Sequence, residues 1–359
     1  MKRRTLLALA ASCLAPPLLA RDLPLAPAPR GGPMSQAMAR KDWESFKSRY
    51  FKPDGRIIDT GNGGISHSEG QGFGLLMAVR FDDRAAFERI LAFSTTALRR
   101  PDDTLFAWRY RLGDTPPVSD LNNATDGDLC AAWALQQAAL RWRQPAYAAR
   151  AIAMAKDILR RCVITAADHT LLLPGVEGFL HPDRLVLNLS YYILPALADL
   201  SVLLPDPAWS RLIADGLAVM RQARYGRWSL PPDWLELPRG VGRPRIAAGR
   251  PPRFSFDAVR IPLNLVWAGL SKEPCVAAAA SFWLEPEFFP RMPAWADLRD
   301  GGIAPYAAPA GIEAVACLAV AAMNGQGRHR ALPLIEDAQD YYNALLVMSA
   351  HFAWEDCSL

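Results

Sequence analysis

Helical periodicity is the feature that most limits what this chain can fold into. From residue 36 onward, apolar side chains recur at intervals of three and four residues, the spacing that lines one face of a helix. One such stripe consists of Trp209, Leu212, Ile213, Leu217 and Met220. Short loops rich in Gly, Pro and Asp separate eleven segments of this kind, at approximately 36–51, 69–79, 84–98, 126–142, 146–161, 189–203, 209–222, 257–270, 274–283, 312–323 and 336–352.

Strand-like segments are few. The clearest is a pair of apolar runs at 162–165 and 170–174, which predicts one small β-hairpin in a loop. The sequence shows neither an alternation of strands with helices nor a fixed repeat length, so neither a parallel α/β sheet nor a regular solenoid is expected. The fold class is therefore predicted to be all-α, built from stacked helical hairpins, with a closed double ring of helices as the natural arrangement.

The first 33 residues are set apart from this pattern. Residues 1–20 begin with three basic residues, followed by an apolar run that is too short and too rich in proline to span a membrane. We interpret 1–20 as a signal peptide, 21–33 as a proline-rich linker and 34–359 as a single domain. The mature protein is then expected in the periplasm or outside the cell, without stable membrane insertion, and the choice between Sec and twin-arginine export stays open.

Composition excludes several classes of partner and cofactor. The chain has 359 residues, 51% of them hydrophobic, which is enough to bury a substantial core. Its formal charge of +4 includes the three basic residues of the leader, so the mature chain is close to neutral and a nucleic-acid partner is not expected. The sequence has no Cys-x-x-Cys or Cys/His cluster with metal-ligand spacing. Neither a metal nor an organic cofactor is expected, because the carboxyl chemistry described below needs none.

An acidic residue opens a helix in the segment 67–74, His-Ser-Glu-Gly-Gln-Gly-Phe-Gly. Ser68 and Gln71 have the spacing of a capping box, which places Glu69 in the first helical turn. The three glycines cost helix stability, roughly 1 kcal/mol each, so another part of the chain is expected to approach the backbone there. An acid in a first turn also complements the helix dipole without further function, and His67 is expected to be a hydrogen-bonded structural residue.

Two other segments repeat this arrangement. Thr125 is a suitable N-cap for a helix that carries Asp126 and Asp128 in its first turn, and Asp257, two residues after Ser255, is expected to open a third helix. Helix starts from separate hairpins can meet at one end of a helical ring, where neighbouring carboxyls push their pKa values apart. Hydrolysis of a glycosidic bond needs such a set, with one protonated and one ionised carboxyl.

Aromatic residues are the second ingredient of a sugar-binding site, because sugar rings present C–H faces that stack on indole and phenol rings. The chain has 11 Trp. Trp108, Trp234 and Tyr192 lie in loops or near helix ends and are candidates for substrate binding. Trp133 and Trp209 fall on apolar helix stripes and are interpreted as core residues.

Together these motifs resemble glycoside hydrolase family 8. The segment 124–128, Ala-Thr-Asp-Gly-Asp, is the signature of that family and is highly specific. The resemblance covers nearly the whole mature chain, because a weaker match at 340–343 extends it into the last predicted helix. The other matching segments, in order, are 68–71 with Gly74, 173–175 with 178–179, 232–234 and 256–260.

The resemblance implies an (α/α)6 barrel of six helical hairpins and inverting endo-hydrolysis of β-1,4-glucan. It assigns Glu69 as the general acid, Asp257 as the general base and Asp126 as the residue that holds the sugar distorted at the cleavage site. Asp128 joins the substrate-binding candidates. Arg260, one turn beyond Asp257, is expected to orient that carboxylate and hold it ionised, with a plain surface ion pair as the alternative. A functional association with the bacterial cellulose synthase complex is also implied.

Some alternatives stay open at this point. Phe256 stands where the family usually has tyrosine, and Asn-Leu-Ser at 188–190 replaces Asn-Pro-Ser, so either Tyr191 or Tyr192 is expected to line the cleft. The same fold also serves xylan, chitosan and mixed-linkage glucan, and a non-catalytic glycan-binding protein is the remaining class. Oligomeric state, disulfide pairing, chain-length preference and the choice between a biosynthetic and a degradative role are left open by the sequence.

Overall fold

The structure is a computed structural model that describes residues 33–166, 168–288, 291–324 and 332–359. The predicted signal peptide, 1–20, and residues 21–32 of the predicted linker lie outside the described residues. Within the described residues, no helix is long and apolar enough to cross a membrane.

The prediction of a mainly helical chain is confirmed, with eleven α-helices in the part of the chain that the structure describes. They are α1 (Pro33–Tyr50), α2 (Ser68–Arg80), α3 (Arg84–Ala97), α4 (Thr125–Arg141), α5 (Pro145–Cys162), α6 (Leu194–Leu203), α7 (Pro207–Gln222), α8 (Arg260–Trp267), α9 (Pro274–Trp283), α10 (Ala310–Asn324) and α11 (Tyr341–Cys357).

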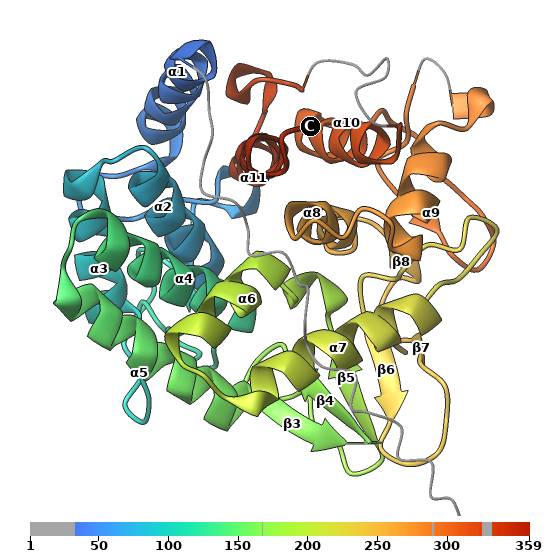
Figure 1. Cartoon of the computed structure of the whole chain (residues 1–359), viewed down its shortest axis with the longest axis horizontal. Coiled ribbons are helices and arrows are strands. Elements are labelled where there is room, and N and C mark those ends of the chain that lie inside the picture. Colours follow the sequence, from blue (N-terminus) through green and yellow to red (C-terminus); the bar gives the residue numbers. More distant parts are fainter. Residues whose placement is uncertain (1–32, 167, 289–290, 325–331) are drawn as a thin grey trace, which may run out of the picture.

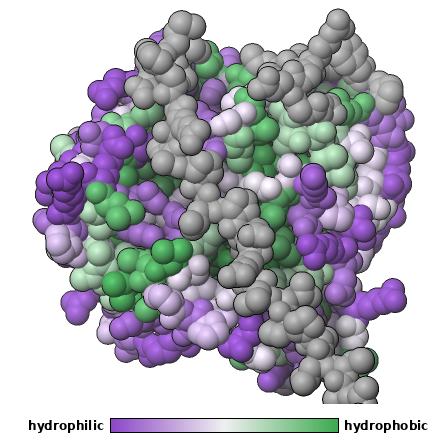
Figure 2. Space-filling view, viewed as in Figure 1, coloured by the Kyte–Doolittle hydropathy of each residue, from purple (hydrophilic) through white to green (hydrophobic). Residues whose placement is uncertain are grey.

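The helices are arranged as a ring, with α2, α4, α6, α8 and α11 toward its centre and α3, α5, α7 and α9 outside them (Figure 1). The burial of each helix follows from this position. Every residue of α8 is buried. In contrast, α5 buries one stripe that includes Tyr147, Met154 and Ile158 and exposes its other side. Figure 2 shows the resulting distribution, with hydrophilic residues along the rim of the molecule.

Short antiparallel strands brace the loops between the helices. The predicted hairpin is present, formed by β3 (Val163–Ala166) and β4 (His169–Leu172). The structure adds strands that the sequence did not predict. They are β1 (Ser66–His67) with β2 (Arg109–Tyr110), a three-stranded sheet of β5 (Arg184–Leu187), β6 (Leu235–Pro238) and β7 (Arg245–Ile246), and β8 (Arg253–Phe254) with β9 (Ala296–Asp297).

Three predicted helices begin later than their periodicity indicated. A 3-10 turn at Leu189–Tyr191 precedes α6, and another at Ile335–Asp337 precedes α11. The third difference concerns Asp257, which lies in a turn at 256–259, while α8 begins only at Arg260. The turn is nevertheless helix-like, because the N–H of Val259 donates to the carbonyl of Ser255.

Candidate active site

The first carboxyl, Glu69, lies in the first turn of α2, as predicted. The residue that caps this helix is His67 and not Ser68. The Nδ1 atom of His67 accepts a hydrogen bond from the N–H of Gly70 at 3.1 Å, and its Nε2 atom lies 3.3 Å from Oδ2 of Asp59. The imidazole therefore fixes where α2 begins.

The predicted capping box at Ser68 and Gln71 is wrong. Ser68 is the first helical residue and is buried. The Gln71 side chain points away from the cap, where it accepts from the N–H of Ile57 at 2.6 Å and donates to the hydroxyl of Ser94 at 3.2 Å. Gln71 thus ties α2 to the segment before it and to α3.

The second carboxyl, Asp126, lies in the first turn of α4 and is 1% exposed. The prediction of Thr125 as the N-cap is wrong by one residue. Ala124 occupies the cap position, without a side-chain hydrogen bond, and Thr125 is the first residue of α4. The Thr125 hydroxyl instead donates to the carbonyl of Leu173 at 2.8 Å. This bond attaches the start of α4 to the strand β4 and the loop that follows it.

Two glycines allow α2 and α4 to approach closely. A Cβ atom on Gly72 would lie 2.5 Å from the carbonyl oxygen of Gly127, and one on Gly127 would lie 2.5 Å from the backbone nitrogen of Glu69. Contacts this short are incompatible with any larger side chain at either position. The expected backbone approach at the glycine-rich start of α2 is therefore present, and it brings Glu69 beside Asp126.

The third carboxyl, Asp257, is held by the turn before α8. Asp233 accepts hydrogen bonds from the N–H groups of Ser255 at 2.9 Å and Ala258 at 2.8 Å, on either side of Asp257. Burial and the nearby charge of Asp257 raise the pKa of Asp233 above its ordinary value. The sequence singled out the segment that contains Asp233 but gave this residue no role, because its partners lie more than twenty positions away.

Arg260 brings the three carboxyls together. Its Nη1 atom lies 3.0 Å from Oδ2 of Asp126 and 3.5 Å from Oε1 of Glu69, and its Nη2 atom lies 2.9 Å from Oδ1 of Asp257. Arg260 is only 5% exposed, which excludes the alternative of a plain surface ion pair. One buried guanidinium therefore connects α2, α4 and the turn before α8.

The three carboxyls have different environments. Burial and then the charge of Glu69 raise the pKa of Asp126, against the opposing effect of Arg260. Asp257 accepts a hydrogen bond from Nε1 of Trp234 at 3.1 Å on the oxygen that does not face Arg260. Apart from Arg260, no described residue donates a hydrogen bond to the Glu69 carboxyl or forms an ion pair with it. Groups of three or more His, Cys, Asp or Glu side chains that could hold a metal ion are absent from the same described residues.

Two of the predicted aromatic residues, Trp234 and Trp108, are partly exposed. Trp234 contacts one of the carboxyls, and Trp108 lies in a neighbouring loop. Trp234 is connected to Asp257 and stacks on Phe179 with ring centroids 5.9 Å apart. Trp108 directly precedes β2, the partner of β1, and its Nε1 atom donates to Asp120 at 2.7 Å. Both rings are half-buried and fixed by a polar partner.

Tyr192 was predicted to bind substrate, and the structure contradicts this. Its ring is completely buried, its hydroxyl accepts from the N–H of Leu172 at 2.9 Å, and it packs so closely on Gly216 that a Cβ there would lie 2.2 Å from the ring. The alternative, Tyr191, faces the carboxyl cluster, with its ring centroid 5.5 Å from the guanidinium carbon of Arg260.

Asp128 is the second predicted substrate-binding residue that the structure corrects. It is fully buried and accepts hydrogen bonds from the N–H of Phe106 and the side chain of Asn123, both at 2.8 Å. Burial raises the pKa of Asp128 to about 7, although both hydrogen bonds oppose that shift. Asp128 therefore holds loops in place and does not reach a cleft.

Sequence reasoning also missed Tyr342 in α11. Its hydroxyl donates to the carbonyl of Phe256, and its ring lies at an angle to the Phe256 ring with centroids 6.2 Å apart. Phe256 is 41% exposed, so this pair forms an aromatic edge directly beside Asp257. The weak motif at 340–343 was the only signal that this tyrosine belonged to the site.

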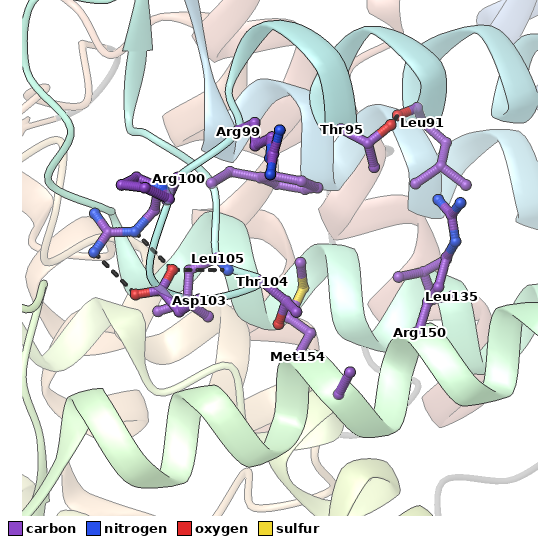
Figure 3. Close-up of a pocket in the computed structure, with 13 residues that line it drawn as sticks. Leu91, Thr95, Arg99, Arg100, Asp103, Thr104, Leu105, Leu135, Arg150 and Met154 are labelled. Atoms are coloured by element: carbon purple, nitrogen blue, oxygen red, sulfur yellow. Dashed lines mark hydrogen bonds and ion pairs between the residues drawn. The ribbon is translucent and has the colours of Figure 1, made fainter.

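A separate pocket of about 330 Å³ lies away from the carboxyl cluster, among α3, α4, α5 and the loop before β2 (Figure 3). An ion pair between Arg100 and Asp103, 2.8 Å apart, forms one side of it, and Leu135 and Met154 contribute apolar surface. None of the three predicted catalytic residues lines this pocket, so it is not the predicted site.

Comparison with known proteins decides the family, because the sequence model of the family "Glycosyl hydrolases family 8" matches residues 33–355. The chain belongs to glycoside hydrolase family 8. It is 42% identical over 322 residues to a probable endoglucanase from Novacetimonas hansenii, covering 89% of this chain and 92% of that protein. It is 40% identical over 282 residues to an endoglucanase from Cellulomonas uda, covering 78% and 77%.

A solved structure gives the same family. The endo-β-1,4-glucanase CMCax from Acetobacter xylinum superimposes with a TM-score of 0.84 at 40% sequence identity, covering 90% of this chain and all of that one. The resemblance recognised in the sequence is confirmed, and so is the fold, an (α/α)6 barrel with small sheets. The chain is a glycoside hydrolase.

Proposed function

We propose that this family 8 hydrolase is an endo-β-1,4-glucanase that inverts the configuration of the cleaved sugar. The observation that carries the proposal is the convergence of Glu69, Asp126 and Asp257 on the Arg260 guanidinium. The probable endoglucanase from Novacetimonas hansenii and the endoglucanase from Cellulomonas uda match most of the chain at 42% and 40% identity, which supports β-1,4-glucan as the substrate.

Glu69 is the proposed general acid, which donates a proton to the leaving glycosidic oxygen. Among the described residues its carboxyl has one contact, the 3.5 Å approach of Arg260, so its oxygens are the least committed of the three. Asp257 is the proposed general base. Arg260 and Trp234 hold its two oxygens, which fixes the direction in which the carboxylate addresses a water molecule.

The spacing of the acid and the base is compatible with inversion. Both carboxylates lie within 3.5 Å of the same guanidinium, at 3.5 Å for Glu69 and 2.9 Å for Asp257. The nearer oxygens are consequently at most about 9 Å apart, which does not exceed the roughly 6.5–9.5 Å that an inverting pair needs to admit water.

Asp126 and the aromatic residues are proposed to position the substrate. Asp126 is buried beside Glu69, where a sugar hydroxyl at the cleavage site is its natural partner. Trp108 and Trp234 are half-buried with Arg109 and Arg250 over their rings, and they are proposed to contact the sugar through the ring surface that stays exposed. Tyr191 takes the place predicted for Tyr192.

We also propose that residues 34–359 form one catalytic domain that acts in the periplasm or outside the cell after cleavage of 1–20. The basic start and apolar run of residues 1–20 support export. A functional association with cellulose synthesis is proposed on the family resemblance. An exported β-1,4-endoglucanase would meet the glucan chain that a cellulose synthase delivers outside the inner membrane.

The test is release of reducing sugar from carboxymethyl-cellulose, xylan and chitosan by the chain lacking residues 1–20, beside its Glu69→Gln variant. Gln keeps the size of the side chain but cannot donate a proton to the leaving group, so kcat on carboxymethyl-cellulose is expected to fall by about 10²–10⁴-fold. NMR of the nascent product is expected to show the inverted α-anomer first. Glu88→Gln, an exposed change on α3, serves as the matched control.

Three outcomes would count against the proposal. Faster hydrolysis of xylan or chitosan than of carboxymethyl-cellulose would keep the family and change the substrate. A β-anomer as first product would exclude inversion. Turnover in the Glu69→Gln protein equal to the Glu88→Gln control would remove Glu69 from the acid role.

A further inference from the structure

The segment 239–253 concentrates positive charge at one edge of the molecule. It contains five arginines and no acidic residue, whereas the formal charge of the entire chain is only +4. Arg245 shares the carboxylate of Glu236 with Arg184, at 3.3 and 3.4 Å. Arg239, Arg243 and Arg250 are exposed, and none of the described residues places a carboxylate within ion-pair distance of them. We call these three residues the arginine strip.

A rigid scaffold holds one end of the arginine strip, Arg250, next to the proposed active site, while Arg239 at the other end lies near α7 and β4. β7 pairs with β6 in the register Leu235 opposite Ile246, and the N–H of Ala247 donates to the carbonyl of Trp234 at 3.0 Å. At the far end of the segment, the carbonyl of Arg253 accepts from the N–H of Asp233 at 2.7 Å. The strip is therefore anchored at both ends to the segment that carries Asp233 and Trp234.

Arg250 makes the direct connection to the site. Its guanidinium carbon lies 3.8 Å from the ring centroid of Trp234, whose Nε1 atom donates to Asp257. A guanidinium stacked on an indole keeps its N–H groups free at its edge, and these match the two oxygens of a carboxylate or the oxygens of a sulfate or phosphate. A negative group on a sugar bound beside Trp234 would meet such an unpaired cation.

We propose that the arginine strip selects β-1,4-glucan chains that carry anionic substituents over neutral chains of the same backbone. This inference rests on the proposed glucanase function and deepens it by naming a substrate class. Exposed, unpaired arginines attract a polyanion over roughly the Debye length, which falls from about 30 Å at 10 mM salt to below 8 Å above 150 mM. The preference is consequently strongest at low salt.

The test compares carboxymethyl-cellulose with neutral hydroxyethyl-cellulose of equal degree of substitution, at 10 and 300 mM NaCl. For the unaltered enzyme we expect KM on carboxymethyl-cellulose to rise by at least about threefold at the higher salt, with a much smaller change on the neutral polymer. In the triple variant Arg239→Gln, Arg243→Gln, Arg250→Gln, the KM on hydroxyethyl-cellulose divided by the KM on carboxymethyl-cellulose is expected to approach one. This ratio is also expected to be the same at both salt concentrations.

A charge-matched control removes three exposed cations from α1, α3 and α5, with Lys41→Gln, Arg84→Gln and Arg150→Gln. This variant is expected to keep the substrate ratio and the salt dependence of the unaltered enzyme. Circular dichroism melting of both variants checks that they fold. Sedimentation with phosphatidylglycerol vesicles tests whether the arginine strip binds an anionic membrane surface instead.

The outcomes separate this inference from the function on which it rests. If neither polymer is cleaved, the glucanase proposal fails. If both are cleaved with equal salt dependence, or if the triple variant and the control variant change the KM ratio equally, only the role of the arginine strip is overturned. Vesicle binding that needs the strip, combined with an unchanged KM ratio, would assign these arginines to an anionic membrane surface and would also overturn the proposal.

Discussion

His67 shows how a single side chain sets the position of the proposed acid. It is followed by Ser68 and then by Glu69, so any change in where α2 begins moves the acid directly. The Nδ1 atom accepts from Gly70, which requires the proton to be on Nε2, where it can be donated to Asp59. The Tyr341 ring packs against the imidazole at 5.3 Å between centroids and fixes its plane.

Replacing His67 by Ala is expected to destabilise the protein by about 1–2 kcal/mol, because the N–H of Gly70 loses its cap. It is also expected to lower kcat more than it changes KM, because the start of α2 and Glu69 become less well positioned. The measurements are urea denaturation and the separate kinetic constants on carboxymethyl-cellulose.

Asn at position 67 is the discriminating variant, since it is among the best N-cap residues and can accept from Gly70 without reproducing the bond to Asp59. Recovery of both stability and kcat in His67→Asn relative to His67→Ala would show that the cap matters. If His67→Asn recovers stability but not kcat, the imidazole itself takes part in the reaction and positioning is the wrong explanation.

The sequence predicted Glu69, Asp126 and Asp257 because each lies in a short motif whose residues act locally. It could not decide between Tyr191 and Tyr192, since adjacent residues in a 3-10 turn point to different sides. The contact that turns Tyr192 inward is made with Gly216, more than twenty residues later. Side-chain direction at such a turn is set by tertiary packing, which no local pattern records.

At the scale of the elements, the contact between α2 and α4 determines how far apart the first two carboxyls lie. At Gly72 and Gly127 the backbones of the two helices approach so closely that neither position has room for a Cβ atom. The glycines reduce intrinsic helix stability, and the close contact is the compensating gain. The low helix propensity at 70–74 is therefore a signature of packing and not of a weak helix.

Gly127→Ala is expected to destabilise the protein by about 1–3 kcal/mol, because the new Cβ atom would overlap the start of α2, and this outweighs the higher helix propensity of Ala. Activity is expected to fall at least about tenfold, since the two helix starts must move apart. Thermal melting and kcat on carboxymethyl-cellulose check both effects.

Gly240→Ala is the control, because nothing lies within 4 Å of a Cβ atom built at that position. Its stability is expected to change by less than about 0.5 kcal/mol. A Gly127→Ala protein that is as stable and as active as Gly240→Ala would mean that the α2–α4 contact tolerates extra volume and does not set the spacing of the carboxyls.

Helices were predicted well because their period is visible within one segment. The sheet of β5, β6 and β7 was not predicted, since its strands are short and come from segments that are separated by up to about sixty residues. The pairing is decided by where the helices place these segments. That sheet nevertheless carries Trp234 and the arginine strip, so an unpredicted element supplies part of the candidate site.

At the scale of the whole molecule, the ring is closed by its first and last elements. Arg49 at the end of α1 donates to the backbone carbonyls of Ile335 and Ala338, and the N–H of Tyr341 donates to Thr60. Closure places Tyr341 against His67 and Tyr342 against Phe256. Two sides of the site therefore depend on a contact that spans nearly the entire chain.

Closing a ring around carboxyls also makes the stability of the whole molecule depend on pH. Burial raises the pKa values of Asp126, Asp128 and Asp233, and that of Asp128 reaches about 7. A carboxyl with a raised pKa in the folded state binds its proton more tightly folded than unfolded. Its contribution to stability is complete below the unfolded pKa near 4 and is lost as the pH rises through the folded pKa.

We therefore expect the free energy of unfolding to decrease between pH 5 and pH 7.5, with Asp128 alone contributing roughly 2–3 kcal/mol over this range. Carboxyls with lowered pKa values, such as Asp83 and Asp157, are ionised in both states above pH 5 and add no slope there. Urea denaturation at half-unit pH steps measures the dependence, beside Asp128→Asn and the exposed control Asp114→Asn.

Asp128→Asn separates the hydrogen bonding of this residue from its titration. The loss of hydrogen bonds lowers the stability at pH 5, whereas the loss of titration changes the slope of stability against pH. The amide brings N–H donors toward Asn123 or Phe106, so the variant is expected to be less stable at pH 5 by about 1–3 kcal/mol. Its slope above pH 5 is expected to be shallower, since one titrating group has been removed, whereas Asp114→Asn keeps the original slope. An unchanged slope in Asp128→Asn would show that Asp128 is ionised throughout this range, with its two N–H donors outweighing the cost of burial.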